Sequence, residues 1–286
     1  MNARAILLAL VIAAVPALAA AQAPESRLKK IKDSKTITLA YRTDASPFSS
    51  EDASKQPVGY SIDLCKRVVS LLEQQIGAQG LQVKWVPVTT QTRFDAVARG
   101  DADMECGSST VTLTRMKQVD FSYFTFLEGT GLLARAELNV RALPDLAGKK
   151  IGVIGGTTNE AALRNALRDR VVNATVVTLN RRDEGLAKLE SKEIDAFASD
   201  MLLLLGLGPK AKDPRSLMMV DDPLSFEPYA IVLPRGESAL RIEVNTALAK
   251  IYRSDAILDL YGRWFGSLGR PGAMLRVMYT LGALQD

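Results

Sequence analysis

Polar side chains follow nearly every predicted strand of this chain, at the point where the strand ends. In the N-terminal part these residues are Arg42, Thr89, Thr90, Arg93, Ser108, Ser109, Thr110 and Arg115. Further along they are Gly155, Gly156, Thr157, Thr158, Arg181, Arg182, Asp183 and Asp200. Most of them stand where the backbone N–H groups of a helix start can receive an anion. The set therefore predicts a site that recognises charged groups of a small molecule.

Each of these residues also has a purely structural interpretation. Thr157 and Thr158 are good helix N-caps, and Asp200 can cap a helix that begins at residue 201. An arginine at a strand end is most often solvated, and a surface ion pair contributes little to stability. The prediction of a binding site rests on their joint placement, because four strand ends carry arginine.

Composition excludes several kinds of chemistry. The chain has no histidine, which removes Ser-His-Asp and Cys-His nucleophiles, histidine acid–base catalysis and most zinc sites. Lysine and arginine number 36 against 32 aspartate and glutamate, a net charge of +4. No basic run is longer than a pair, so we expect no nucleic-acid partner. We also expect no cofactor and no metal.

The N-terminus indicates a secreted protein. Arg4 precedes an apolar run from Ala5 to Val15, and mostly small residues follow from Ala17 to Ala23. This is the pattern of a cleaved signal peptide, which we place at residues 1–21, with cleavage after Ala19 as the second choice. A retained anchor or a buried helix is the alternative, but a membrane span needs about 20 apolar residues. The oxidising compartment allows Cys65 and Cys106 to form a disulfide, or they stay as two buried thiols.

Strands and helices alternate in two stretches of the chain. Predicted strands cover residues 36–41, 81–88, 102–106, 150–154, 174–179, 194–198 and 216–220, with residues 47–57 as a loop. Predicted helices cover residues 60–76, 90–99, 158–169, 183–191, 200–207, 237–252 and 255–265. Such alternation is typical of βαβ units and parallel sheets. Two long extended segments, residues 121–135 and 229–233, separate the stretches.

These elements predict an α/β fold with two lobes, each a doubly wound, mainly parallel sheet, joined by two extended crossings. The first lobe comprises residues 22–128 and 230–286, and the second comprises residues 129–229. Ligands of open parallel sheets bind beyond the carboxyl ends of the strands. With two such sheets facing each other, we expect the polar strand ends to meet in a cleft.

Several motifs in the same order resemble the periplasmic amino-acid-binding proteins of ABC uptake systems (solute-binding protein family 3), and within them the glutamate/aspartate branch. They are residues 28–34 (LKKIKDS), 59–64 (GYSIDL), 105–110 (ECGSST) with Arg115, 156–158 (GTT), 189–191 (LES) and 264–265 (WF). The resemblance covers nearly the whole mature chain and implies a type II binding-protein clamp that closes by a hinge. It also implies a periplasmic, monomeric protein that binds glutamate or aspartate and delivers it to an inner-membrane ABC permease.

The resemblance further implies a role for each site residue. Arg115 matches the arginine that binds the ligand α-carboxylate, with Ser108, Thr110, Thr157 and Thr158 as further donors. Asp200 matches the acceptor of the α-ammonium group. Arg42, Thr90 and Arg93 match positions that bind the side-chain carboxylate. At Arg182 the chain departs from the pattern, which has a histidine there. Arg182 either contacts the ligand in the same cationic role or points to solvent, and both alternatives are left open.

Two other functions are compatible with this scaffold. One is a periplasmic enzyme such as a dehydratase acting on a prephenate-like acid. That enzyme needs a positioned acid or base, for which Asp200 and Glu105 are the candidates. The other is a ligand-sensing clamp that reports to a membrane receptor. We expect a binding protein and not an enzyme.

Overall fold

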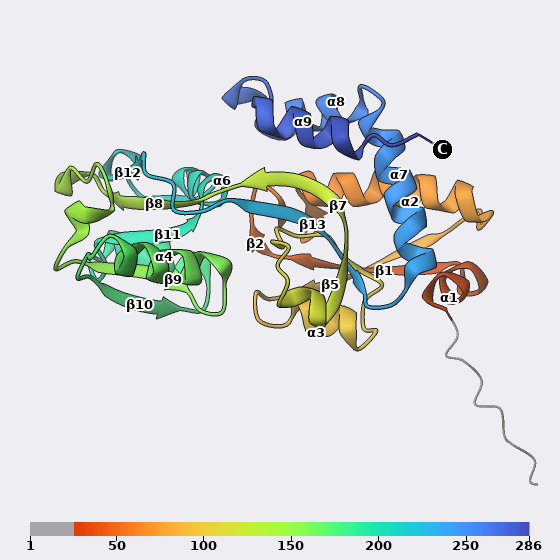
Figure 1. Ribbon diagram of the computed structural model, residues 1–286, viewed down its shortest axis with the longest axis horizontal. Coiled ribbons are helices and arrows are strands. Elements are labelled where there is room, and N and C mark those ends of the chain that lie inside the picture. The colour runs from red at the N-terminus through yellow and green to blue at the C-terminus, as the bar shows by residue number, and fades with distance from the viewer. Residues whose placement is uncertain (1–25, 286) are drawn as a thin grey trace, which may run out of the picture.

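The computed structural model describes residues 26–285, so the predicted signal peptide lies outside the described residues. Two five-stranded sheets form the framework, and Figure 1 shows them side by side, joined by extended strands. The first sheet has the order β5 (Gln82–Val88), β1 (Thr36–Arg42), β6 (Met104–Glu105), β13 (Glu227–Pro234) and β7 (Val119–Glu128). The second has the order β10 (Thr175–Leu179), β9 (Lys150–Ile154), β11 (Ala196–Asp200), β8 (Thr130–Arg135) and β12 (Leu217–Val220).

Both sheets are mixed. Three strands of each are parallel, β5-β1-β6 and β10-β9-β11, and the remaining two pair in antiparallel fashion. The antiparallel pairs arise because the chain crosses from the first sheet to the second through β7 and β8, and returns through β12 and β13 (Figure 1). Between β7 and β8 stands only Gly129.

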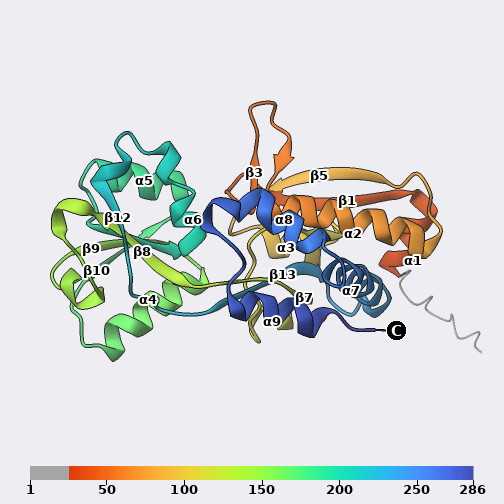
Figure 2. The ribbon, with the colours of Figure 1, turned by 90° about the horizontal axis from the view of Figure 1, so that it is seen from above.

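Helices cover the faces of both sheets, as Figure 2 shows from above. Around the first sheet are α1 (Arg27–Ser34), α2 (Tyr60–Ile76), α3 (Arg93–Ala98), α7 (Ser238–Tyr252), α8 (Ala256–Phe265) and α9 (Ala273–Gly282). Around the second are α4 (Thr158–Asp169), α5 (Arg182–Glu190) and α6 (Met201–Leu205). Short 3-10 helices cover Arg115–Lys117, Ala136–Leu138, Leu143–Leu146, Gly208–Lys210, Pro214–Ser216 and Gly266–Leu268. We call the elements on the first sheet the first unit and those on the second sheet the second unit.

Helix α2 illustrates how the sequence sets an element. Its buried side chains include Ile62, Leu64, Val68 and Leu72, which form one helical face against the first sheet. Fully burying a side chain of this kind contributes about 1.5–3 kcal/mol. The helix ends at Gly77, whose φ of 64° lies in the left-handed region that glycine adopts without strain.

The start of α2 is fixed by a second glycine. Gly59 has a φ of 140°, and a Cβ atom there would clash with the carbonyl oxygen of Phe48. This close approach ties α2 to a small three-stranded sheet of β2 (Asp44–Ala45), β3 (Ser49–Glu51) and β4 (Pro57–Val58). Residues 47–57 were expected to form a loop, and this prediction was wrong. Strands of two or three residues are too short for a periodic pattern to reveal them.

Two further elements differ from expectation. Helix α3 begins at Arg93 and not at residue 90, because Thr89 and Thr92 bind each other in a turn before it. Helix α9 was not expected. It lies against β7 and α7, where it buries Leu275 and Tyr279.

The sulfur atoms of Cys65 and Cys106 are bonded to each other, and their Cα atoms are 6.3 Å apart. The bridge joins α2 to the residue that follows β6. It lies within the first unit, where it fastens a helix to the central strand of the sheet. Of the two alternatives for these cysteines, the structure has the disulfide.

Candidate functional site

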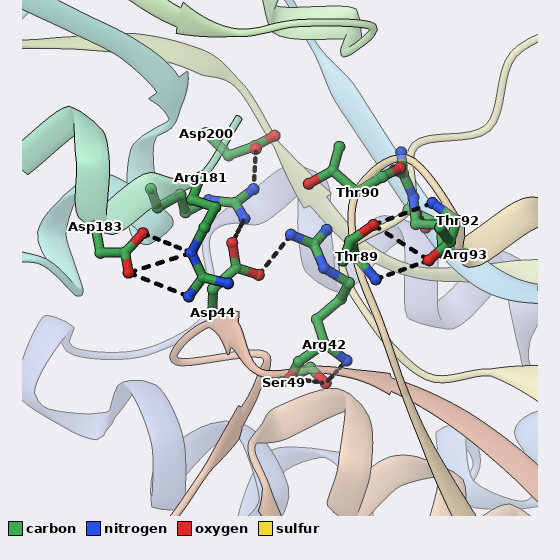
Figure 3. A network of polar contacts seen from close by, with 12 residues as sticks. Arg42, Asp44, Ser49, Thr89, Thr90, Thr92, Arg93, Arg181, Asp183 and Asp200 are labelled. Atoms are coloured by element: carbon green, nitrogen blue, oxygen red, sulfur yellow. Dashed lines mark hydrogen bonds and ion pairs between the residues drawn. The ribbon is translucent and has the colours of Figure 1, made fainter. Parts of the chain in front are cut away.

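The carboxyl ends of the parallel strands in both sheets are directed toward the junction of the two units. The clearest evidence is contacts across it, between Asp44 and Arg182 and between Thr110 and Thr158. Figure 3 shows Arg42, Asp44, Thr90 and Asp200 around the same central region. The candidate site therefore lies between the units.

Arg42 is the last residue of β1 and is buried. Its Nη2 lies 2.5 Å from Asp44 Oδ1, and its backbone N–H donates to Ser49 Oγ at 2.9 Å. Burial lowers the pKa of Arg42, and the nearby cation Arg182 acts in the same direction. The cation is therefore held in a dry environment with another cation close by.

Arg93 is equally buried, at the start of α3. Its Nε donates to Ser109 Oγ at 2.9 Å, Nη1 donates to the carbonyl of Thr90, and the guanidinium carbon lies 4.3 Å from the centre of the Phe94 ring. Burial, together with the nearby cations Arg115 and Arg42, lowers the pKa of Arg93 to about 9. Three arginines thus influence one another at the edge of the first sheet.

Arg115 begins a short 3-10 helix and is half-buried. Its Nη1 donates to the carbonyl of Thr110 at 2.7 Å, and its guanidinium carbon lies 4.9 Å from the centre of the Phe94 ring. These contacts hold the guanidinium beside the turn that contains Ser108 and Thr110. Ser108 is half-buried, and Thr110 is buried.

Glu227, at the start of β13, joins the two units through hydroxyl groups. Its Oε2 accepts hydrogen bonds from Thr110 Oγ1 at 2.7 Å and from Thr158 Oγ1 at 2.6 Å. Its Oε1 accepts from Ser225 Oγ at 2.7 Å and from Thr130 Oγ1 at 3.2 Å. Two of the four predicted hydroxyl donors, Thr110 and Thr158, therefore meet at one buried carboxylate.

Thr157 takes the structural role that its residue type allows. It is the N-cap of α4, and its Oγ1 accepts from the N–H of Glu160 at 3.1 Å and donates to the carbonyl of Ile154 at 2.7 Å. Its side chain is therefore engaged within its own turn. Thr158 is the first residue of α4 and reaches across to Thr110 and Glu227 instead.

Arg182 and Asp200 are buried on the second unit. Arg182 Nη1 lies 3.6 Å from Asp44 Oδ2, and Nη2 lies 4.0 Å from Asp200 Oδ2. Arg182 is thus not solvated, whereas its neighbour Arg181 is exposed and pairs with Asp183 (Figure 3).

Asp200 does not act as a helix cap. It precedes α6, yet its side chain accepts no hydrogen bond from the described backbone of that helix. Burial raises the pKa of Asp200, Glu227 raises it further, and Arg182 opposes both. Asp200 is a buried carboxyl group with free acceptor capacity at the junction.

Within the described part of the chain, the buried donor atoms at this junction that have no hydrogen-bond partner include four on Arg42, Thr90 and Arg182. They are Arg42 Nε, Thr90 Oγ1, Arg182 Nε and Arg182 Nη1. Leaving a buried donor unpaired costs about 1–3 kcal/mol, and more for a charged group. A ligand oxygen that accepts from these donors would remove this cost. The described residues contain no cluster of side chains that could hold a metal ion.

Three acidic residues that organise the site, Asp44, Glu128 and Glu227, were not predicted from the sequence. Asp44 stands in the short strand β2, two residues beyond the end of β1. Glu227 and Glu128 stand at the start of β13 and the end of β7. Because β13 runs antiparallel to β6, its first residue lies at the same edge as the carboxyl ends of the parallel strands. Applying this rule to the crossings would have identified Glu227.

No helix among the described residues is both long enough and apolar enough to cross a bilayer. Residues 37–267 match the model of the bacterial extracellular solute-binding proteins, family 3. The chain is 36% identical over 258 residues to the L-glutamate/L-aspartate-binding protein of Pseudomonas aeruginosa, covering 90% of this chain and 85% of that protein. It is 32% identical over 245 residues to the glutamate/aspartate import solute-binding protein of Salmonella typhimurium, covering 86% of this chain and 81% of that protein.

A solved structure of an ancestral amino-acid-binding protein, described as a precursor of cyclohexadienyl dehydratase, has a similar fold. It superposes with a TM-score of 0.73 at 26% identity, covering 84% of this chain and 100% of that chain. This likeness and the two mixed sheets confirm the predicted α/β clamp. The chain belongs to the bacterial extracellular solute-binding proteins, family 3.

Proposed function

We propose that this protein captures glutamate or aspartate in the periplasm and delivers it to an ABC importer of the inner membrane. The observation that carries the proposal is the set of four unpartnered buried donors on Arg42, Thr90 and Arg182. A neutral side chain gives no compensation for burying these guanidinium groups, whereas a carboxylate accepts from several of them at once. The names of the relatives in Pseudomonas and Salmonella support the same ligands.

The ligand lies across the junction in this proposal. Arg115 binds the α-carboxylate, with Ser108 as a further donor, while Asp200 accepts from the α-ammonium group. Thr110 and Thr158 join this set when their hydroxyl groups turn from Glu227 to the ligand. Arg42, Thr90 and Arg182 bind the side-chain carboxylate. Arg93 adds positive charge, since two of its nitrogens already donate to Ser109 and Thr90. Thr157 supports this set from its turn, because its hydroxyl is engaged in capping α4.

The remaining proposals concern the chain as a whole. Residues 1–21 are a signal peptide that is removed on secretion, and the mature protein is a monomer. The first lobe comprises residues 22–128 and 230–286, and the second comprises residues 129–229. The relatives are named as binding and import proteins, which supports binding over catalysis.

Calorimetry on the mature protein tests the ligand. We expect glutamate or aspartate to bind far more tightly than glutamine, asparagine or leucine, because only the acidic ligands satisfy the buried donors. Tight binding of a neutral amino acid without a response to glutamate or aspartate would contradict the proposal. Formation of product from a prephenate-like acid would instead favour the enzyme.

A further inference from the structure

Asp44 lies between two cations that come from different units. Its Oδ1 is 2.5 Å from Arg42 Nη2 in the first unit, and its Oδ2 is 3.6 Å from Arg182 Nη1 in the second. The side chains are 14%, 3% and 5% exposed for Asp44, Arg42 and Arg182. Figure 3 shows the Asp44 carboxylate directed at Arg42.

Asp44 is an anion in this setting. Burial raises the pKa of Asp44, but Arg42 and Arg182 together outweigh burial, so its pKa is lowered from the ordinary value. Arg42, Asp44 and Arg182 therefore carry a net charge of +1. Arg93 is a separate buried cation, whose Nε and Nη1 already donate to Ser109 and Thr90. Asp200 lies 4.0 Å from Arg182 and, in the proposed function, its charge is matched by the ammonium group of the ligand. Both groups are the same in every variant compared below.

The Asp44 carboxylate does not exhaust the donors of its two partners. Arg42 Nε and Arg182 Nε are buried and have no hydrogen-bond partner among the described residues. The two guanidinium groups thus present donors for a second carboxylate, beside the one that Asp44 already supplies. Arg42, Asp44 and Arg182, which we call the trio, can therefore neutralise one further negative charge.

We propose that Asp44 is a specificity-determining residue that sets the charge at the side-chain end of the site. By holding this end at +1, it admits a side chain with one negative charge and disfavours a side chain with two. This inference rests on the proposed capture of acidic amino acids. Asp44 acts through electrostatics and through its contacts with Arg42 and Arg182.

The test compares three ligands of similar backbone at pH 8, where a phosphate monoester carries close to two negative charges. They are glutamine, glutamate and O-phosphoserine, with side-chain charges of about 0, −1 and −2. Asp44→Asn raises the trio to +2, so the ratio Kd(phosphoserine)/Kd(glutamate) should fall at least about tenfold. Arg182→Gln lowers the trio to 0, so the ratio Kd(glutamine)/Kd(glutamate) should fall by a similar factor.

Asp183→Asn is the matched control. Asp183 is also an aspartate that pairs with an arginine at the start of α5, but both partners are exposed. In Asp183→Asn, the ratios Kd(phosphoserine)/Kd(glutamate) and Kd(glutamine)/Kd(glutamate) should stay within about threefold of the wild-type values, since exposed pairs interact weakly. A residue that only supports the fold would weaken all three ligands together and leave the ratios unchanged.

Each outcome decides the proposal. A fall in Kd(phosphoserine)/Kd(glutamate) for Asp44→Asn and a fall in Kd(glutamine)/Kd(glutamate) for Arg182→Gln support it, and an unchanged ratio in either folded variant overturns it. If circular dichroism shows that one variant is unfolded, the other decides alone. A wild-type protein that binds neither glutamate nor aspartate refutes the proposed function itself, and this result is seen before any variant is measured.

Discussion

Most charged residues of the site are buried, and the chemistry of arginine suits a buried binding site. A guanidinium offers five donors in a fixed plane, so a single side chain binds a protein partner and still offers donors to a ligand. Arg115 uses Nη1 for the carbonyl of Thr110 and rests on the Phe94 ring. Its orientation is therefore fixed before the ligand arrives, which reduces the entropy lost on binding.

Arg115→Ala should weaken glutamate binding by about 2–5 kcal/mol, a factor of tens to thousands, because it removes the two-point contact with the α-carboxylate. Arg115→Lys should recover only part of the loss, since an ammonium group cannot make two parallel bonds. Calorimetry measures both, with Arg99→Ala as the control. Arg99 is an exposed arginine that pairs with Asp95 on α3. Wild-type affinity in a folded Arg115→Ala variant would refute the assignment of Arg115.

The sequence predicts the basic residues of the site better than the acidic ones. Arg42 and Arg93 stand near the ends of clearly patterned strands, and Asp200 directly precedes a helix. Asp44 and Glu227 stand beside segments that have no parallel-strand signature, and their partners are distant in the chain. Glu227 binds Thr110 and Thr158, which are 117 and 69 residues away. No local pattern encodes such contacts.

At the level of elements, Glu128 connects the first crossing to the site. It ends β7, and its Oε2 accepts from the N–H of Gly129 at 2.8 Å while Oε1 accepts from the N–H of Leu202 in α6 at 3.0 Å. Burial and the nearby Asp200 raise the pKa of Glu128 to about 8, against the opposing effect of the backbone donors. The folded protein therefore keeps a proton on Glu128 that the unfolded chain releases at lower pH.

This linkage predicts how stability depends on pH. Between the ordinary pKa of 4.5 and about 8, the folded state binds the Glu128 proton and the unfolded state does not, so stability falls as pH rises through this range. Glu128→Gln cannot ionise, so its urea midpoint relative to wild type should increase from pH 5 to pH 9. Asp101→Asn, at an exposed position, should show no such trend. A constant difference between Glu128→Gln and wild type would refute a protonated Glu128.

The fold could be predicted from sequence wherever an element is long and periodic. Strand β9 and helix α4 have the predicted bounds, because alternating and helical apolar patterns over these residues are clear. The strands β2, β3 and β4 were missed because two or three residues show no period. Helix α9 was also missed, although its apolar residues Met274, Leu275, Met278 and Tyr279 stand at helical spacing.

At the scale of the whole molecule, the site is assembled from two units joined by few segments. The crossings through β7–β8 and β12–β13 carry the covalent connection. Across the junction, Asp44 meets Arg182, and Thr110 meets Thr158. A ligand that touches both units gains its second set of contacts only when the units are together, so it favours that arrangement by the difference in affinity.

The ligand should therefore close the protein only if it carries groups for both units. In the proposed function, glutamate places its α-carboxylate at Arg115 in the first unit and its ammonium group at Asp200 in the second. Glutarate keeps both carboxylates but lacks the ammonium group, so it should bind more weakly and shift the units less at equal concentration. Small-angle X-ray scattering measures this shift as a decrease in the radius of gyration. Asp200→Asn, which keeps the shape of the side chain and removes its charge, should reduce the advantage of glutamate over glutarate. If glutarate compacts the wild-type protein at the same concentrations as glutamate, Asp200 is not the acceptor of the ammonium group.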